Sequence, residues 1–115
     1  MTQPTIDPAA FDELKETAGA DFAVELVDTF LTEAPSMLAE LRRAFTAGDT
    51  DAFRRAAHSL KSNGNTFGAR AFAAMAKELE LGGMAPVRSA GGAQLAALED
   101  EYKRVAQALT ELKGE

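Results

Sequence analysis

The stretch Thr50–Gly68 reads TDAFRRAAHSLKSNGNTFG, and its small and apolar residues recur at alternating four- and three-residue steps. At roughly 100° per residue these positions share one face of a helix, in a stripe about 80° wide. Asp49 or Thr50 is suited to cap its start. The stretch therefore predicts an amphipathic helix over 50–67 that packs by one face: Phe53, Ala57, Leu60, Gly64 and Phe67.

The same periodicity continues on both sides of this stretch. Asp7-Pro8 predicts a helix start, because Asp can cap and Pro suits the first helical position. Pro35 predicts a kink or break in the long segment before Gly48, since proline removes a backbone hydrogen bond. Four glycines and a proline make 82–92 the clearest loop. We expect helices over 8–18, 21–47, 50–67, 69–81 and 93–113.

Four amphipathic segments of comparable length with short connections predict an all-α fold. The simplest packing is an antiparallel four-helix bundle, with the short additional N-terminal helix covering one end. The 115 residues, 46% of them hydrophobic, suffice for one domain over 1–115 and one core. A start at Met1 and an end soon after the last helix suit a free-standing domain, although an excised part of a hybrid kinase would look alike.

Composition excludes several classes of function. The net charge of −6 disfavours nucleic-acid and anionic-membrane partners. Cysteine is absent, so disulfides and thiolate chemistry are excluded, and the single histidine cannot build a metal cluster. No signal peptide and no apolar run of roughly 20 residues is present. We expect a cytoplasmic monomer with no cofactor.

The single histidine, His58, lies about 140° from the middle of the apolar stripe and is expected to face solvent. Its helical neighbours on that face are cationic or polar, and no carboxylate in the sequence is closer than Asp51. Such surroundings favour a neutral imidazole that can act as a nucleophile and suit an anion carried on the ring. These neighbours are Arg54, Arg55, Lys61, Ser62 and Asn65.

Other features near His58 allow more than one interpretation. A lone histidine is commonly a residue of no special importance. Gly64 lies in the packed stripe, which favours close approach of a neighbouring helix, whereas Gly68 is either a helix terminator or a packing residue. Lys77 and Glu80 could approach the histidine, but a solvated helix face is the simpler interpretation.

Residues His58–Ala69, HSLKSNGNTFGA, resemble the signature of the histidine-phosphotransfer (HPt) family. That pattern is His, any residue, an aliphatic residue, Lys, three small residues, two variable positions, an apolar residue, Gly and a small residue. Two positions depart from it: Ser62 stands where the family often has Gly, and Asn63 is larger than usual. The resemblance covers the whole chain, because the family fold is a four-helix bundle with a short extra N-terminal helix.

The resemblance implies that His58 accepts a phosphoryl group and relays it between receiver-domain aspartates in a two-component phosphorelay. Lys61 would stabilise the phosphoryl group. The implied partners are receiver domains and a sensor or hybrid histidine kinase, and Mg²⁺ is expected only on the receiver. The chain would then be a phosphocarrier and not an enzyme acting alone. Packing or access is assigned to Ser62, Gly64 and Gly68, and a receiver-docking rim to Arg54, Arg55 and Asn65.

Two other classes of function remain open at this point. A helical adaptor could bind a receiver domain without being phosphorylated, although the His58 and Lys61 pair would then be idle. A metal- or acid-base-dependent helical enzyme would need a second ligand or a convergent set of titratable residues, which the sequence does not offer.

Overall fold

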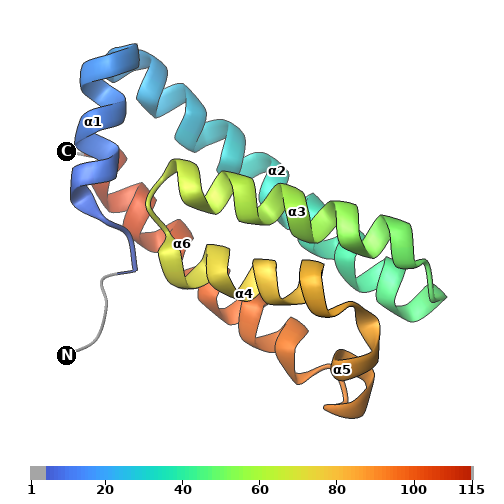
Figure 1. The fold of residues 1–115 in the computed structure, drawn as a ribbon. Helices are drawn as coiled ribbons and strands as arrows, with labels where there is room; N and C mark the ends of the chain where they lie inside the picture. The colour runs from blue at the N-terminus through green and yellow to red at the C-terminus, as the bar shows by residue number, and fades with distance from the viewer. Residues whose placement is uncertain (1–4, 115) are drawn as a thin grey trace.

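A computed structural model describes residues 5–114, and within this range every regular element is an α-helix (Figure 1). The predicted helices are present, and each end lies within one residue of its predicted position. The elements are α1 (Pro8–Ala18), α2 (Ala20–Ala47), α3 (Thr50–Thr66), α4 (Arg70–Gly82), α5 (Met84–Ser89) and α6 (Ala93–Gly114).

Helices α2, α3, α4 and α6 form the bundle, in which α2 and α4 each pack against both α3 and α6 (Figure 1). Short turns join α2 to α3 and α3 to α4, so consecutive helices run antiparallel. The predicted stripe of α3 faces the core, where Phe53, Ala57 and Leu60 have no exposed surface. The all-α four-helix bundle is confirmed.

Local capping explains why the helices begin where the sequence predicts. The Asp7 carboxylate accepts a hydrogen bond from the backbone N–H of Ala9 at 3.0 Å, and the Asp49 carboxylate accepts one from Ala52 at 3.1 Å. Each satisfies a backbone donor that has no partner within its own helix. Between α2 and α3, Gly48 has φ +74°, a left-handed value that glycine adopts without strain.

Pro35 does not break α2, which continues as one helix from Ala20 to Ala47. Proline lacks the N–H that would bond the carbonyl of Leu31 one turn earlier. The Tyr102 hydroxyl of α6 lies 3.4 Å from that carbonyl and donates to it. A neighbouring helix thus supplies the missing donor, which helps α2 to accommodate the proline.

The prediction of a loop over 82–92 was wrong for its central part, which forms the short helix α5. Pro86 is the third residue of this helix, where a missing N–H leaves no intrahelical bond unmade. Met84 and Val87 are buried, and α5 packs against α4 and α6. Two apolar side chains therefore anchor a segment whose composition resembles a loop.

The turn between α3 and α4 is fastened to the start of α1. The backbone N–H of Asp7 donates to the carbonyl of Gly68 at 3.0 Å, and Arg70 donates to the Asp7 carboxylate at 2.8 Å. A Cβ on Gly68 would lie 2.7 Å from the Cβ of Ala10. Helix α1 thus packs directly on this turn.

Across the described part of the chain, none of the helices combines the length and the apolar character needed to span a membrane.

Candidate functional site

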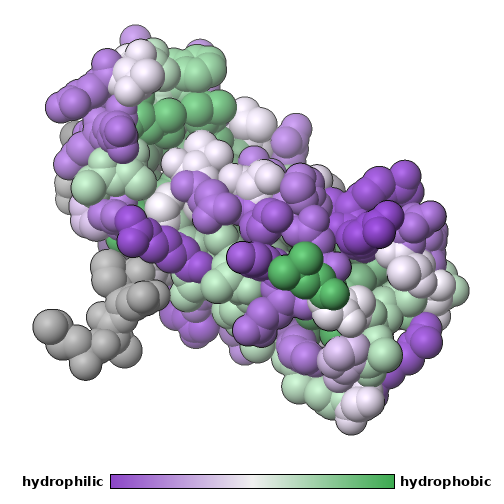
Figure 2. Space-filling model, viewed as in Figure 1, coloured by the Kyte–Doolittle hydropathy of each residue, from purple (hydrophilic) through white to green (hydrophobic). Residues whose placement is uncertain are grey.

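His58 lies on α3 with its side chain 57% exposed, whereas the neighbouring Ala57 and Leu60 are completely buried. The helical phase that places these two residues in the core directs the histidine outward, as the wheel predicts. The face of α3 seen in Figure 2 is largely hydrophilic. A macromolecular partner can therefore reach this imidazole.

The inference that no carboxylate lies near His58 was wrong. Glu80 of α4 places Oε2 2.7 Å from the His58 Nδ1 and Oε1 2.8 Å from the Lys61 Nζ. Glu80 is only 16% exposed, so the solvated-face interpretation does not hold for it. One carboxylate thus bridges the two residues of α3 that carry the family resemblance.

The helical spacing of residues in α4 contains a sequence signal for Glu80. Ala73 and Ala76 are buried, and Glu80 follows them at the next helical step of the same face. These small side chains help α4 to approach α3 closely. Lys77, the other residue considered on this helix, is exposed.

The bridge fixes the tautomer of His58. Hydrogen bonding to Lys61 holds the pKa of Glu80 below its ordinary value, against the effect of burial, and His58 lowers it further. At neutral pH the carboxylate is therefore ionised and can only accept hydrogen bonds, so Nδ1 must carry the proton. In the neutral ring the lone pair is then on Nε2. No other described residue makes a hydrogen bond to this nitrogen.

Lys61, which the helical spacing places among the outward-facing neighbours of His58, is mostly buried: only 24% of its side chain is accessible. It lies one turn after His58 on the same face of α3, and Glu80 holds its ammonium group beside the imidazole. A positive charge is thus held near the imidazole through their shared carboxylate. Ser62, one residue further, is exposed and leaves this face unobstructed.

Gly64 and Gly68 serve close packing, in different ways. A Cβ on Gly64 would lie 2.9 Å from the Phe72 ring and 3.3 Å from the Cβ of Ala73, so glycine lets α4 lie against α3. Gly68 has φ +70° and also faces α1. Both interpretations of Gly68, terminator and packing residue, therefore apply.

The predicted docking-rim residues Arg54, Arg55 and Asn65 are all exposed on α3. Arg54 lies 3.5 Å from Asp51, which is also on α3. Asn65 lies near α1, where it lines a shallow depression with Leu14. Arg55 instead faces α2. The three residues thus surround His58 on different sides and do not form one cluster.

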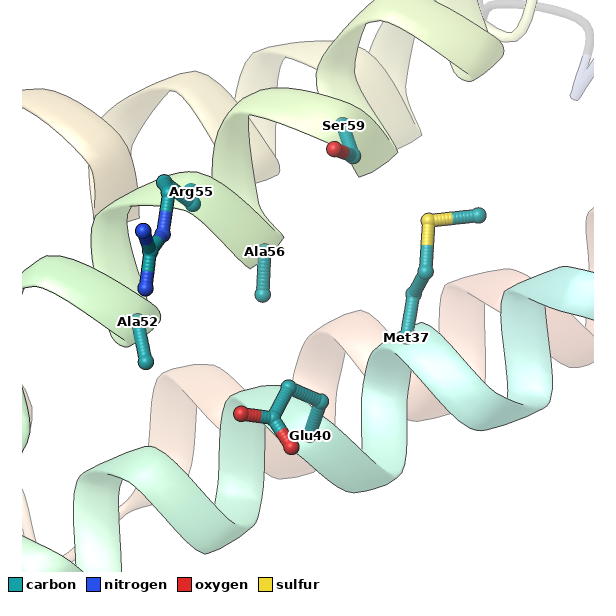
Figure 3. Close-up of a pocket in the computed structure, with 6 residues that line it drawn as sticks. All are labelled: Met37, Glu40, Ala52, Arg55, Ala56 and Ser59. Carbon is teal, nitrogen blue, oxygen red and sulfur yellow. The ribbon is translucent and has the colours of Figure 1, made fainter.

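A groove between α2 and α3 lies beside this face, and the sequence did not reveal it. Figure 3 shows its side chains directed toward a common space between the two helices. The lining residues are Met37, Glu40, Ala52, Arg55, Ala56 and Ser59.

Comparison with known proteins agrees with this geometry. A family model of the Hpt domain matches residues 25–113, from the first turns of α2 almost to the end of α6. The chain belongs to the Hpt domain family. The matched range contains the whole His58–Lys61–Glu80 cluster, and the predicted HPt resemblance is confirmed.

The Hpt likeness extends to the N-terminal helix in a solved structure. The crystal structure of histidine-containing phosphotransfer protein B (HptB) from Pseudomonas aeruginosa PAO1 is similar over 98% of this chain and 97% of that chain, with a TM-score of 0.83 and 28% sequence identity. Among curated proteins no significant match was found. The family and the fold thus rest on two independent comparisons.

Proposed function

We propose that this Hpt protein works in a two-component phosphorelay, with Nε2 of His58 as the phosphoryl acceptor. The observation that carries the proposal is the bridge from Glu80 to both His58 and Lys61. It holds an exposed ring by Nδ1, leaves Nε2 to act as the nucleophile and holds a cation near the ring. Phosphoryl transfer is mainly positioning and neutralisation of charge, and these residues supply both.

Phosphoryl transfer to His58 exchanges a P–O bond for an N–P bond. The Nε2 lone pair attacks the phosphorus of a receiver aspartyl phosphate, an N–P bond forms, and the P–O bond to the aspartyl oxygen breaks. The carboxylate leaves with that electron pair. The Nδ1 proton stays in the hydrogen bond to Glu80, whose negative charge offsets the positive charge developing on the ring. Attack by a second receiver carboxylate on the same phosphorus reverses these changes.

Lys61 and Glu80 have different roles in this proposal. The Lys61 ammonium lies where it can contact oxygens of a phosphoryl group on His58, with the exposed Ser62 hydroxyl as a further donor. Phosphorylation would then make Lys61 divide its hydrogen bonds between Glu80 and the phosphoryl group. Glu80 acts through the histidine and is a positioning residue.

The proposal also covers partners and location. Receiver domains, with a sensor or hybrid histidine kinase upstream, would donate and accept the phosphoryl group in the cytoplasm. The receiver would bring its own Mg²⁺, and we propose that this chain uses no cofactor. Acting as a carrier, it would return to its starting state only after a partner has taken the phosphoryl group.

Phosphotransfer from a charged receiver tests the proposal. Receiver domains from the same genome are phosphorylated with labelled acetyl phosphate and mixed with the wild type or with His58→Gln. Acid-labile, base-stable label on the wild type that is absent from the variant is the expected result. Stable binding of a receiver with no label on the chain would instead identify an adaptor.

Glu80→Gln tests the positioning role, with the exposed Glu78→Gln on the same helix as the matched control. In Glu80→Gln we expect His58 to change from one tautomer to a mixture of two, which ¹⁵N NMR detects. We also expect phosphoryl transfer to slow by about tenfold, the effect of losing one charge-assisted hydrogen bond. An unchanged tautomer would show that Glu80 does not orient the ring.

A further inference from the structure

The two oxygens of the Glu80 carboxylate have different surroundings. Oε1 is shielded from solvent and lies 2.8 Å from the Lys61 ammonium, whereas Oε2 lies 2.7 Å from Nδ1 of His58. Ala76 and Leu79, which precede Glu80 on α4, are buried, and α4 packs along α3 (Figure 1). The carboxylate is therefore held from two sides, and a phosphoryl group on Nε2, the opposite nitrogen of the ring, does not need to displace it.

Of the charged side chains on the helices around the ring, Glu80 is the acid that contacts it. These side chains are Arg54, Arg55 and Lys61 on α3, Lys77 and Glu80 on α4, and Glu40 on α2. Glu40 is already paired with Arg43 on its own helix. Within residues 5–114, the carboxylate at hydrogen-bond distance from the imidazole is that of Glu80. The proton on Nδ1 is therefore controlled mainly by Glu80 and by its partner Lys61.

Phosphorylation changes what the Nδ1 proton does to the ring. In free His58, a ring with its one proton on Nδ1 is neutral. Once Nε2 is bonded to phosphorus, the same proton makes the ring an imidazolium cation. A carboxylate in contact with such a cation raises the pKa at which the proton is lost, by about 1–3 units. Glu80 is ionised and able to act in this way, because hydrogen bonding to Lys61 holds its own pKa below the ordinary value.

Loss of the phosphoryl group to water shows why this proton matters. Water attacks the phosphorus, an O–P bond forms, and the N–P bond breaks with its electron pair returning to Nε2. If Nδ1 carries a proton, the ring leaves as neutral imidazole, and both protons of the water remain on the product, dihydrogen phosphate. Without that proton the ring would have to leave as an imidazolate anion, a much stronger base and a poorer leaving group. The protonated ring therefore releases its phosphoryl group faster.

We propose that Glu80 sets the lifetime of the phosphorylated state, by keeping the phosphorylated ring protonated and ready to release its group. This inference rests on the proposed function, and it gives Glu80 a role after phosphorylation in addition to orienting the free ring. The His58 side chain is 57% exposed, so water can reach the group, and protonation of the ring decides how long the group remains. The chain is then a short-lived intermediate that passes its phosphoryl group on, and not a store of it.

The pH dependence of the decay tests this role. The wild type, Glu80→Gln and the exposed control Glu78→Gln are phosphorylated by a receiver that carries an affinity tag, and the receiver is then removed. Decay of the Nε2 phosphoryl signal is followed by ³¹P NMR from mildly acidic to alkaline pH. The decay rate should fall above a midpoint that reports the pKa of the phosphorylated ring.

We expect this midpoint to be lower by about one pH unit or more in Glu80→Gln. Above both midpoints, Glu80→Gln should then decay at least about tenfold more slowly than the wild type, since one unit of pKa is a tenfold change in the protonated fraction. Glu78→Gln should decay as the wild type does. Equal midpoints and lifetimes in the wild type and Glu80→Gln would overturn the proposal. Faster decay of Glu80→Gln would also overturn it, because Glu80 would then protect the phosphoryl group from water.

Lys61→Ala separates the proton from a second consequence of Glu80→Gln, in which Lys61 loses its partner and binds the phosphoryl group more fully. The midpoint should still fall when Glu80→Gln is introduced into the Lys61→Ala background. If it does not, the effect belongs to Lys61 and the proposal is overturned. A wild type that takes no phosphoryl group from any receiver would refute the proposed function and this inference with it, whereas the other contrary results overturn the inference alone.

Discussion

Replacement of Gly68 by alanine tests how α1 holds the turn beneath the site. Gly68 has φ +70°, a conformation that costs a residue with a Cβ about 1–2 kcal/mol. The added Cβ would also lie 2.7 Å from the Cβ of Ala10 and 2.9 Å from that of Asp7. These atoms are close to the backbone and cannot swing away, so we add the usual overpacking cost of about 1–3 kcal/mol. The sum is a loss of about 2–5 kcal/mol.

Gly91→Ala is the matched control, because Gly91 has φ +66° and a Cβ added there would meet no heavy atom within 4 Å. It should lose only the backbone part, about 1–2 kcal/mol. Urea unfolding followed by circular dichroism at 222 nm gives both free energies of unfolding. Equal losses for Gly68→Ala and Gly91→Ala would refute the reasoning, since contact between α1 and the turn would then contribute nothing to the effect.

Three further predictions concern the site and its support. Lys61→Ala should slow transfer from a receiver by about ten- to a hundredfold, because it removes the hydrogen bond from Lys61 to the charged phosphoryl group. Its helical circular dichroism should be unchanged. An undiminished transfer rate would count against the role of Lys61. Gly64→Ala should lower the free energy of unfolding, measured in urea, by about 0–2 kcal/mol. The steric overlap with Phe72 matches or outweighs the gain of about 1 kcal/mol in helix propensity. A clear gain in stability would show that Gly64 is not in close contact with Phe72. Hydrogen bonding to Arg42 lowers the pKa of Glu99 below its ordinary 4.5. The stability from this pair is therefore present above that value and lost as the pH falls through the lowered pKa. The free energy of unfolding of the wild type should fall between neutral pH and about pH 3, and in Glu99→Gln this fall should be smaller by less than about 1 kcal/mol. If the free energy of unfolding of wild type and variant depends on pH in the same way, the pair contributes nothing.

Much of the fold follows from local signals in the sequence. Asp7 and Asp49 cap helices where their side chains can accept backbone hydrogen bonds, and the stripe through Leu60 identifies the buried face of α3. At both prolines that lie inside helices, the outcome depends on contacts outside the local sequence. The effect of Pro35 depends on a donor from Tyr102, 67 positions further along the chain, and Pro86 occupies a helical turn that only burial of its neighbours reveals.

The site was predictable in its centre and not in its surroundings. Helical phase alone directs His58 outward, and the resemblance assigns Lys61 a role beside it. Glu80 was considered but interpreted as part of a solvated helix face, because its contact with His58 depends on how closely α4 packs against α3. The groove at Arg55 was missed for the same reason: it needs two helices at a known separation, with small side chains between them.

The nitrogen that carries the phosphoryl group tests the central claim most directly. The wild-type chain, labelled with ¹⁵N on histidine and phosphorylated by a receiver, is examined by ³¹P and ¹⁵N NMR. The bridge from Glu80 predicts one phosphoryl group on Nε2 of His58, with the Nδ1 proton retained. A phosphoryl group on Nδ1, on another residue, or on the His58→Gln variant would contradict the account.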